Sequence, residues 1–204
     1  MNTQQCLQML REIKDTAFAT VDENGFPQIR MIDIMLTENK KLYFCTARGK
    51  DFYHQLMRDG HVAITAMNRN YQMIRVTGIA EKLSEQKYWI DYIFEENTSM
   101  NSVYPNESRY ILEPFCIANA QIEFFDLGQT PIYRESFGIG NWNAAEKGFV
   151  ITDSCIGCGK CKRNCPQQCI TDGKPYSIEQ NHCLHCGLCF EKCPANAIKK
   201  ECVS

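Results

Sequence analysis

The chain has 204 residues, of which 44% are hydrophobic and 23% charged, a composition typical of a globular protein with a buried core. A formal net charge of −2 and the lack of a block of Lys and Arg residues argue against a nucleic-acid partner. The N-terminus lacks the pattern of a signal peptide, and no apolar run approaches the roughly 18 residues that span a bilayer. We therefore expect a cytoplasmic protein with no membrane partner.

The first 126 residues have the alternating pattern of a mainly β domain. Period-two alternation between turn signals predicts strands over 16–22, 28–36, 41–47, 61–68, 72–83 and 114–126. Helical spacing predicts short helices over 50–59 and after an N-cap at Ser84. Because most strands follow one another directly, we expect an antiparallel barrel with peripheral helices and not a doubly wound sheet.

Residues 127–150 have glycines, a proline and no clean period, which predicts a connecting segment. Its aromatic residues Tyr133, Phe137 and Trp142 indicate that it packs on something. Residues 151–204 then form a second, small domain with a different composition.

The tail is an internal repeat rich in cysteine. Ten of the thirteen cysteines lie between Cys155 and Cys202, and a shift of 28 residues superposes the runs "CIGCGKCKRNCP" and "CLHCGLCFEKCP". In a chain without a signal peptide the thiols stay reduced, so this clustering points to metal and not to disulfides.

Each run has the spacing CxxCxxCxxxCP, in which three cysteines can surround one [4Fe-4S] cluster. In this bacterial-type pattern the fourth cysteine ligates the other cluster. The expected sets are Cys155, Cys158, Cys161 and Cys193 for cluster I, and Cys165, Cys183, Cys186 and Cys189 for cluster II. The alternative is a pair of zinc sites, although zinc has no use for the third cysteine followed by Cys-Pro.

The tail resembles a bacterial two-[4Fe-4S] ferredoxin along its full length, which implies a small α+β fold. Cys169 and Cys202 are left over. Cys169 superposes on Ala197 and is expected to act as a buried small hydrophobe. Cys202 is expected to be an exposed bystander, and Cys6 and Cys116 are assigned to packing.

Two cations of the first domain point to an anion. Arg30 stands inside the apolar run "QIRMIDIML" and needs a partner or a ligand. Asp33 lies three residues further on, so it faces the other side of the strand. Lys50 begins a predicted helix, where a side-chain charge and free N–H groups can converge on a phosphate. The fingerprint GxGxxG is absent, which argues against a Rossmann site.

A resemblance covers about residues 10–126. "FATVDENGFPQIRMIDIMLTENKKLYFCTARGKDFYHQLMRDGHVAITA", with "IRVTGIAEKL", is similar to the FMN-binding split β-barrel of the pyridoxamine 5′-phosphate oxidase-like superfamily. The resemblance implies a homodimer with FMN at the subunit interface. It implies that Arg30 and Lys50 hold the FMN phosphate, and that the flavin ring and site are lined by Met31, Ile32, Cys45 and Thr46.

Each residue also has an ordinary alternative. Arg30 can pair with a surface carboxylate, Lys50 can be a solvated helix residue, and Cys45 and Thr46 can be plain strand residues. The family's C-terminal substrate-binding segment has no match in this chain, so oxidation of pyridoxine phosphate is not expected.

The expected function is that of a flavin and iron-sulfur oxidoreductase. Electrons would pass between two [4Fe-4S] clusters and FMN, exchanged with an external donor or acceptor protein, to reduce a small substrate under anaerobic conditions. No pair of catalytic acid and base residues is recognisable, and His54 and His61 are read as structural. The alternative is an electron carrier or redox sensor in which the barrel serves for dimerisation or docking.

Overall fold

The computed structural model describes residues 1–142 and 146–203, and the side chains of residues 1–142 and 148–201. The chain forms two compact units. The first unit contains Met1–Asn68, Met73–Glu123 and Phe137–Asn143, and the second contains Arg69–Gln72, Phe124–Ser136 and Ala144–Ser204. The second unit thus groups the cysteine-rich tail with short segments that precede residue 137.

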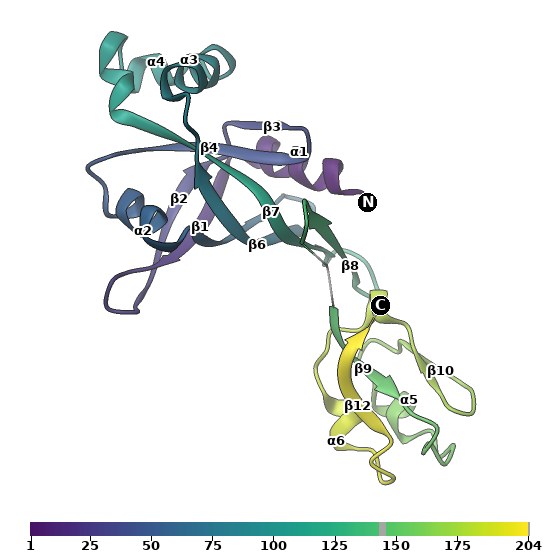
Figure 1. The fold of residues 1–204 in the computed structure, drawn as a ribbon. Helices are drawn as coiled ribbons and strands as arrows, with labels where there is room; N and C mark the ends of the chain where they lie inside the picture. The colour runs from purple at the N-terminus through teal and green to yellow at the C-terminus, as the bar shows by residue number, and fades with distance from the viewer. Residues whose placement is uncertain (143–145, 204) are drawn as a thin grey trace. The chain divides into compact units, whose positions relative to one another are not determined.

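Strands β1 to β8 form one sheet of eight strands, most of whose residues belong to the first unit (Figure 1). Its strand order is β2-β1-β5-β6-β7-β4-β3, with β8 paired to β7. The strands are β1 Asp15–Val21, β2 Pro27–Asp33, β3 Leu36–Glu38, β4 Lys41–Ala47, β5 His61–Met67, β6 Gln72–Lys82, β7 Leu112–Asp126 and β8 Tyr133–Ile139. β1 pairs antiparallel with β2 and β5, β5 with β6, and β4 with β3 and β7. The prediction of a mainly antiparallel β fold is confirmed.

The helices of this unit lie at the sheet's margins. They are α1 Thr3–Ile13, α2 Asp51–Asp59, α3 Gln86–Glu96 and α4 Met100–Val103, with a 3-10 turn at Asn106–Ile111. A capping box starts α1, because Asn2 accepts from the N–H of Gln5 while the Gln5 side chain accepts from the N–H of Asn2. Ser84 is not the N-cap of α3; Glu85 holds that position, without a side-chain hydrogen bond.

The predicted strand 28–36 is two strands. β2 ends at Asp33 and β3 starts at Leu36. These strands occupy opposite ends of the strand order but are joined by only two residues, so the sheet must curl until its two edges lie close together. The connecting residues Ile34 and Met35 are buried, which explains why the apolar run continued past the end of the strand.

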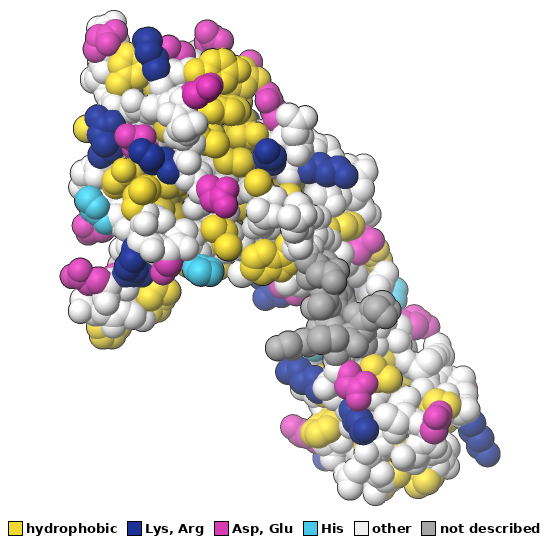
Figure 2. Space-filling view, in the orientation of Figure 1, with side chains coloured by type: hydrophobic (Ala, Val, Ile, Leu, Met, Phe, Trp, Pro, Cys, Tyr) yellow, Lys and Arg dark blue, Asp and Glu magenta, His cyan; other side chains and the backbone are white. Residues whose placement is uncertain are grey.

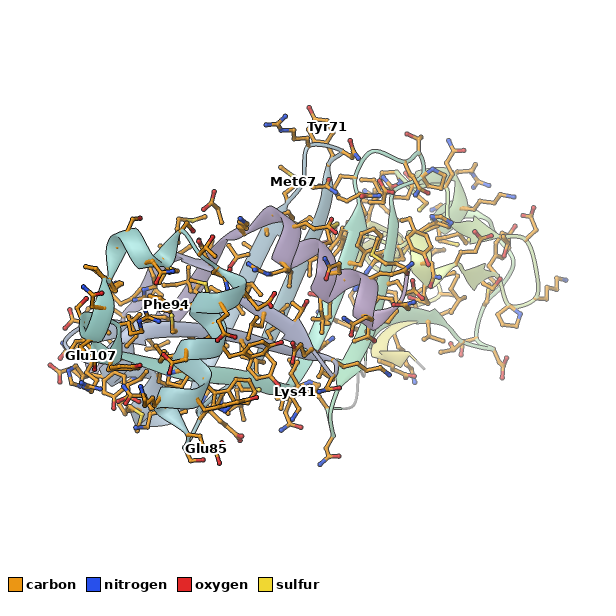
Figure 3. The ribbon with its side chains drawn as sticks, turned by 90° about the horizontal axis from the view of Figure 1, so that it is seen from above. Lys41, Met67, Tyr71, Glu85, Phe94 and Glu107 are labelled. Atoms are coloured by element: carbon orange, nitrogen blue, oxygen red, sulfur yellow. The ribbon has the colours of Figure 1, made fainter. Side chains whose placement is uncertain are left out.

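Two clusters of buried side chains fill the first unit. On one side of the sheet, Phe44 packs against Phe18, Phe52 and Phe115, with ring centroids 5.0, 5.9 and 5.5 Å apart. On the other side, α3 packs its buried residues against β4. Phe94, labelled in Figure 3, is one of the buried residues of α3. Met67 and Tyr71, also labelled, lie where β5 turns into β6, and their side chains are exposed.

The second unit contains two pairs of antiparallel strands. β9 Glu146–Ile151 pairs antiparallel with β12 Ile198–Val203, and β10 Ile170–Thr171 pairs with β11 Ser177–Ile178. Short helices lie within the cysteine motifs, α5 at Lys160–Asn164 and α6 at Leu188–Glu191, and a 3-10 turn covers Gln180–His182. The segment 127–150, expected to connect the domains, therefore contributes β8 and the described part of β9 to regular sheets.

Lys and Arg side chains are interspersed with Asp and Glu on the face shown in Figure 2, and no patch of one sign dominates that face. Among the described residues, no helix has the length and apolar character that crossing a membrane requires.

Candidate functional site

Two cavities of the second unit are lined by the cysteines of the repeat. Cavity I is lined by Cys155, Cys158, Cys161 and Cys193, together with apolar residues that include Ile151 and Ile198. Three of these cysteines come from the first run and one from the second. The structure thus brings together the four side chains assigned to cluster I by their spacing.

Cavity II has the reciprocal composition. It is lined by Cys165 from the first run and by Cys183, Cys186 and Cys189 from the second, with Cys169 as a fifth cysteine. Ile170 and Ile178 supply apolar walls. In the described part of the chain, no three His, Cys, Asp or Glu side chains converge on a point suited to a single metal ion. The cysteines instead line cavities I and II.

Glycines allow the cysteine loops to turn into their helices. Gly159 and Gly187 follow the second cysteine of each run and have φ values of 67° and 82°, a left-handed conformation that costs glycine little. Each begins a short helix that carries the third cysteine, Cys161 or Cys189, into the interior. The fourth cysteine follows the helix and lies in the other cavity.

The thiols differ in their electrostatic surroundings. Burial raises the pKa of Cys161, and raises that of Cys189 to about 11, because a thiolate loses its hydration there. The Ala197 N–H donates to Cys193 Sγ at 3.3 Å, a bond that favours a thiolate. A bound iron-sulfur core takes thiolate ligands and would offset the cost of burying them.

Cys169 is buried beside cavity II, and its Sγ lies 3.6 Å from Cys165 Sγ. Its thiol donates a hydrogen bond that lowers the pKa of Cys183 to about 6, and the same bond raises the pKa of Cys169 itself. The burial predicted for Cys169 is observed; the position predicted for the Cys202 side chain lies outside the described residues.

A third cavity lies in the first unit, at the start of α2. It is lined by Arg30, Met31 and Ile32 of β2 and by Gly49, Lys50, Asp51 and Phe52, and we call it the Arg30 cavity. Four of the six residues predicted to bind FMN therefore meet at one place. Cys45 and Thr46 are not among its lining residues; they lie next to each other on β4, so their side chains point to opposite faces of the sheet.

Arg30 is held by neutral groups. Its guanidinium donates to Thr20 Oγ1 and to Gln55 Oε1, the latter at 2.9 Å, and lies 4.6 Å from the centroid of the Phe52 ring. Burial lowers the pKa of Arg30 and the charge of Asp51 opposes this, but an arginine in a protein stays protonated. The predicted alternative, an ion pair with a surface carboxylate, is not recorded among the described residues. A half-buried cation with neutral partners suits an anionic ligand.

The start of α2 adds to this positive field. Lys50 is its N-cap residue and makes no side-chain hydrogen bond to the first turn. A helix that begins without a side-chain cap has N–H groups available to an anion, and the helix dipole favours negative charge at that end. Arg30, Lys50 and the first turn of α2 thus fit a phosphate group, although Asp51 places a carboxylate nearby.

Sequence reasoning missed the residues that support Arg30. Thr20 and Gln55 are both buried polar residues, at the end of β1 and on α2. The only signal in the sequence was that both polar residues stand at positions where the periodicity of the apolar residues predicts a buried side chain. A neighbouring polar cavity shares Arg30 and is lined also by His54, Gln55 and Arg58 of α2. His54, read as structural from the sequence, therefore lines a cavity.

Comparison with known proteins agrees with this geometry. A family model described as pyridoxamine 5′-phosphate oxidase matches residues 3–112, more than half of the chain. The chain belongs to this family. A second model, a 4Fe-4S dicluster domain, matches residues 147–201. The family's FMN-binding fold is thus joined to an iron-sulfur domain, a combination of redox modules suited to electron transfer.

The matching part of the tail is also 44% identical to a ferredoxin from Butyribacterium methylotrophicum over 32 residues. The match spans 58% of that ferredoxin and 16% of this chain.

Solved structures share the fold of this oxidase-family unit. A NimC/NimA family protein from Clostridium acetobutylicum superposes with a TM-score of 0.57 and 19% identity, over 67% of this chain and 92% of its own. A protein of the same organism related to general stress protein 26 gives a TM-score of 0.53 at 14% identity, over 68% and 97%. An FMN-binding oxidase-related protein from Nostoc punctiforme gives 0.50 at 15%, over 68% and 93%. These likenesses establish the split-barrel fold.

Proposed function

We propose that this protein is an FMN-dependent iron-sulfur oxidoreductase in which electrons pass between two [4Fe-4S] clusters and FMN to reduce a small substrate under anaerobic conditions. The observation that carries the proposal is the lining of cavities I and II, each of which combines the first three cysteines of one run with the fourth cysteine of the other, as in a two-cluster ferredoxin. Cys155, Cys158, Cys161 and Cys193 would hold one cluster, and Cys165, Cys183, Cys186 and Cys189 the other.

The Arg30 cavity supports the flavin. Arg30 and Lys50 would bind the phosphate of FMN, with the first turn of α2 donating N–H bonds, while Met31 and Ile32 line the same cavity. Bound FMN would supply the exchange between single electrons and two-electron chemistry. Cys45 and Thr46 stay predicted site residues on the evidence of the family motif alone. A reducing, cytoplasmic compartment would keep the cluster thiols available.

A homodimer is part of the proposal. β2 is an edge strand, and its side chains Ile29 and Met31 are 72% and 60% exposed. In the sheet they stand opposite Ala19 and Ala17 of β1, so small and apolar side chains continue the same face. Such a contiguous apolar face on an edge is suited to cover by a second copy. Because Met31 also lines the Arg30 cavity, the second copy would border the flavin site.

Metal and flavin analysis of anaerobically purified protein tests the function. We expect about eight irons per chain, a broad visible absorbance that dithionite bleaches, and one FMN after reconstitution. Zinc in place of iron would remove the cluster assignment. Failure to bind flavin at all would remove the enzyme assignment and leave the electron-carrier alternative.

Stopped-flow spectroscopy separates the enzyme from a carrier or sensor. After anaerobic mixing with a reductant, the clusters and the flavin should be reduced in the same protein, and an added acceptor should reoxidise both with turnover. Reoxidation without any turnover of small acceptors would favour the carrier or sensor.

A further inference from the structure

Arg134 is a buried cation in the second unit. It lies on β8 and is only 6% exposed, and its guanidinium lies 5.4 Å from the centroid of the Phe125 ring. Arginine is rarely buried to this extent, because removing its charge from water is costly unless other groups compensate. The groups in contact with Arg134 show what compensates for its burial.

Its contacts lead to cavity II. Arg134 Nη1 contacts the ring of His185, at 2.7 Å from Nδ1 and 3.0 Å from Nε2, and lies 3.5 Å from the carbonyl oxygen of Cys183. His185 stands between Cys183 and Cys186, two of the proposed ligands. An arginine in a protein stays protonated, so Arg134 places its positive charge close to the backbone that carries Cys183.

The internal repeat supplies a comparison within the same chain. The 28-residue shift superposes His185 on Gly157. Gly157 has φ of 72°, and His185 keeps the same left-handed conformation with φ of 53° although it has a side chain. A left-handed backbone is unfavourable for a residue with a side chain, and the contact with Arg134 offsets part of that cost.

Cavity I lacks a buried counterpart among the described residues. The cations placed around it are Lys160, Arg163 and Lys174, and all three are exposed. Arg163 does donate to the Cys158 carbonyl oxygen, at 3.1 Å. Water and salt screen an exposed charge strongly and a buried one weakly. The two cavities therefore differ in electrostatic field despite their matched cysteines.

We propose that Arg134, oriented by His185, makes the cluster of cavity II easier to reduce than the cluster of cavity I, which sets the order in which electrons fill the tail. This inference rests on the proposed two clusters. A cluster gains one negative charge when it accepts one electron, so a fixed positive charge stabilises its reduced form and raises its reduction potential. An electron that arrives at cavity I from a donor would move on to cavity II, oxidising the first cluster and reducing the second.

Redox titration of the full-length protein followed by electron paramagnetic resonance tests this. The wild type should show two unequal midpoint potentials. Arg134→Met should lower the higher potential and leave the lower one unchanged. Arg134→Lys keeps a charge and should retain most of the separation. Arg163→Met is the matched control at cavity I, where a much smaller shift is expected because that side chain is exposed.

His185→Gly tests the orienting role, since glycine is what the repeat itself has at that position. It should keep the iron content and lower the higher potential by less than Arg134→Met does. High salt should leave the wild-type separation largely intact. Equal potentials in the wild type, a shift of the lower potential in Arg134→Met, or an equal shift in Arg163→Met would overturn the proposal.

Two outcomes separate this inference from the proposed function. Iron near eight per chain with no separation of potentials would reject the role of Arg134 and leave the clusters standing. Iron absent from the wild type would reject the clusters themselves. If Arg134→Met fails to load iron, the titrations of the wild type and His185→Gly decide.

Discussion

Cys169 and Ala197 hold the same place in the two cysteine runs, and this pair shows what a repeat can and cannot predict. The spacing alone identified four cysteines for each cavity, because a compact cofactor restricts how far apart its ligands can be. It also predicted that Cys169 is buried. It did not predict the hydrogen bond to Cys183, which depends on how the thirteen residues between Cys169 and Cys183 fold.

Replacing Cys169 by Ala should therefore leave the clusters in place. The substitution copies the residue that cavity I already has, so we expect about eight irons per chain and an unchanged visible spectrum. Cys165→Ala is the matched change and should cost about half of the iron, because it removes a proposed ligand of cluster II. Iron and sulfide assays after anaerobic purification compare the two. Loss of iron from Cys169→Ala would mean that this thiol is a ligand.

Changing Arg30 and Lys50 together to Ala should weaken FMN binding by at least tenfold, because two phosphate-binding cations are lost. The iron content should not change. Flavin released on denaturation and fluorescence titration with added FMN measure the effect.

Arg58→Ala is the control for this pair of changes. Arg58 lines the neighbouring polar cavity and donates to the Val21 carbonyl oxygen, but it is absent from the Arg30 cavity. FMN binding should survive it. If Arg58→Ala releases the flavin and the double variant does not, the ligand belongs to the neighbouring cavity.

At the scale of elements, the strands of the barrel were predictable from alternation, but their limits were not. The break between β2 and β3 falls inside one apolar run. It could not be seen in the sequence, because the connecting residues Ile34 and Met35 are buried like strand residues. β8 escaped prediction because its pairing with β7 is a contact between segments and leaves only a weak period in the sequence. Thr20, Gln55 and Arg30 likewise meet only because β1, β2 and α2 converge.

Gly78 shows a backbone requirement on β6. A Cβ at this position would lie 2.6 Å from both Ala120 Cβ and the Asn119 carbonyl oxygen of β7. We expect Gly78→Ala to lower the free energy of unfolding by about 1–3 kcal/mol, as overpacking does. Urea unfolding followed by tryptophan fluorescence reports on the first unit, because Trp89 and Trp142 both lie in it.

Gly49→Ala is the matched control for Gly78. Nothing lies within 4 Å of a Cβ built at Gly49, and its φ is not in the left-handed region. Its unfolding free energy should stay within about 0.5 kcal/mol of the wild type. Equal effects of the two changes would contradict the close approach of β6 to β7.

At the scale of the whole molecule, we expect the apolar face of β2 to hold two chains together. Ile29→Asp with Met31→Asp should convert the dimer into a monomer, because each change places a charge in a desolvated contact. Light scattering coupled to size-exclusion chromatography gives the mass. Met57→Asp with Val103→Asp, at exposed apolar residues elsewhere, should leave the mass unchanged. A wild type that is monomeric at micromolar concentration would contradict the prediction.

The exchange of the fourth cysteine between the two runs has a consequence for biosynthesis. Cavity II takes Cys165 from the first run, and cavity I takes Cys193 from the second. On the ribosome, the first run alone can therefore offer neither site a full set of ligands. Cavity I lacks its fourth cysteine until Cys193 has been translated, and β12, which pairs with β9, is translated later still. Both proposed clusters could therefore be completed only after Cys189 and Cys193 have been translated, and a chain truncated before Cys189 would have a full set of four cysteines for neither cavity.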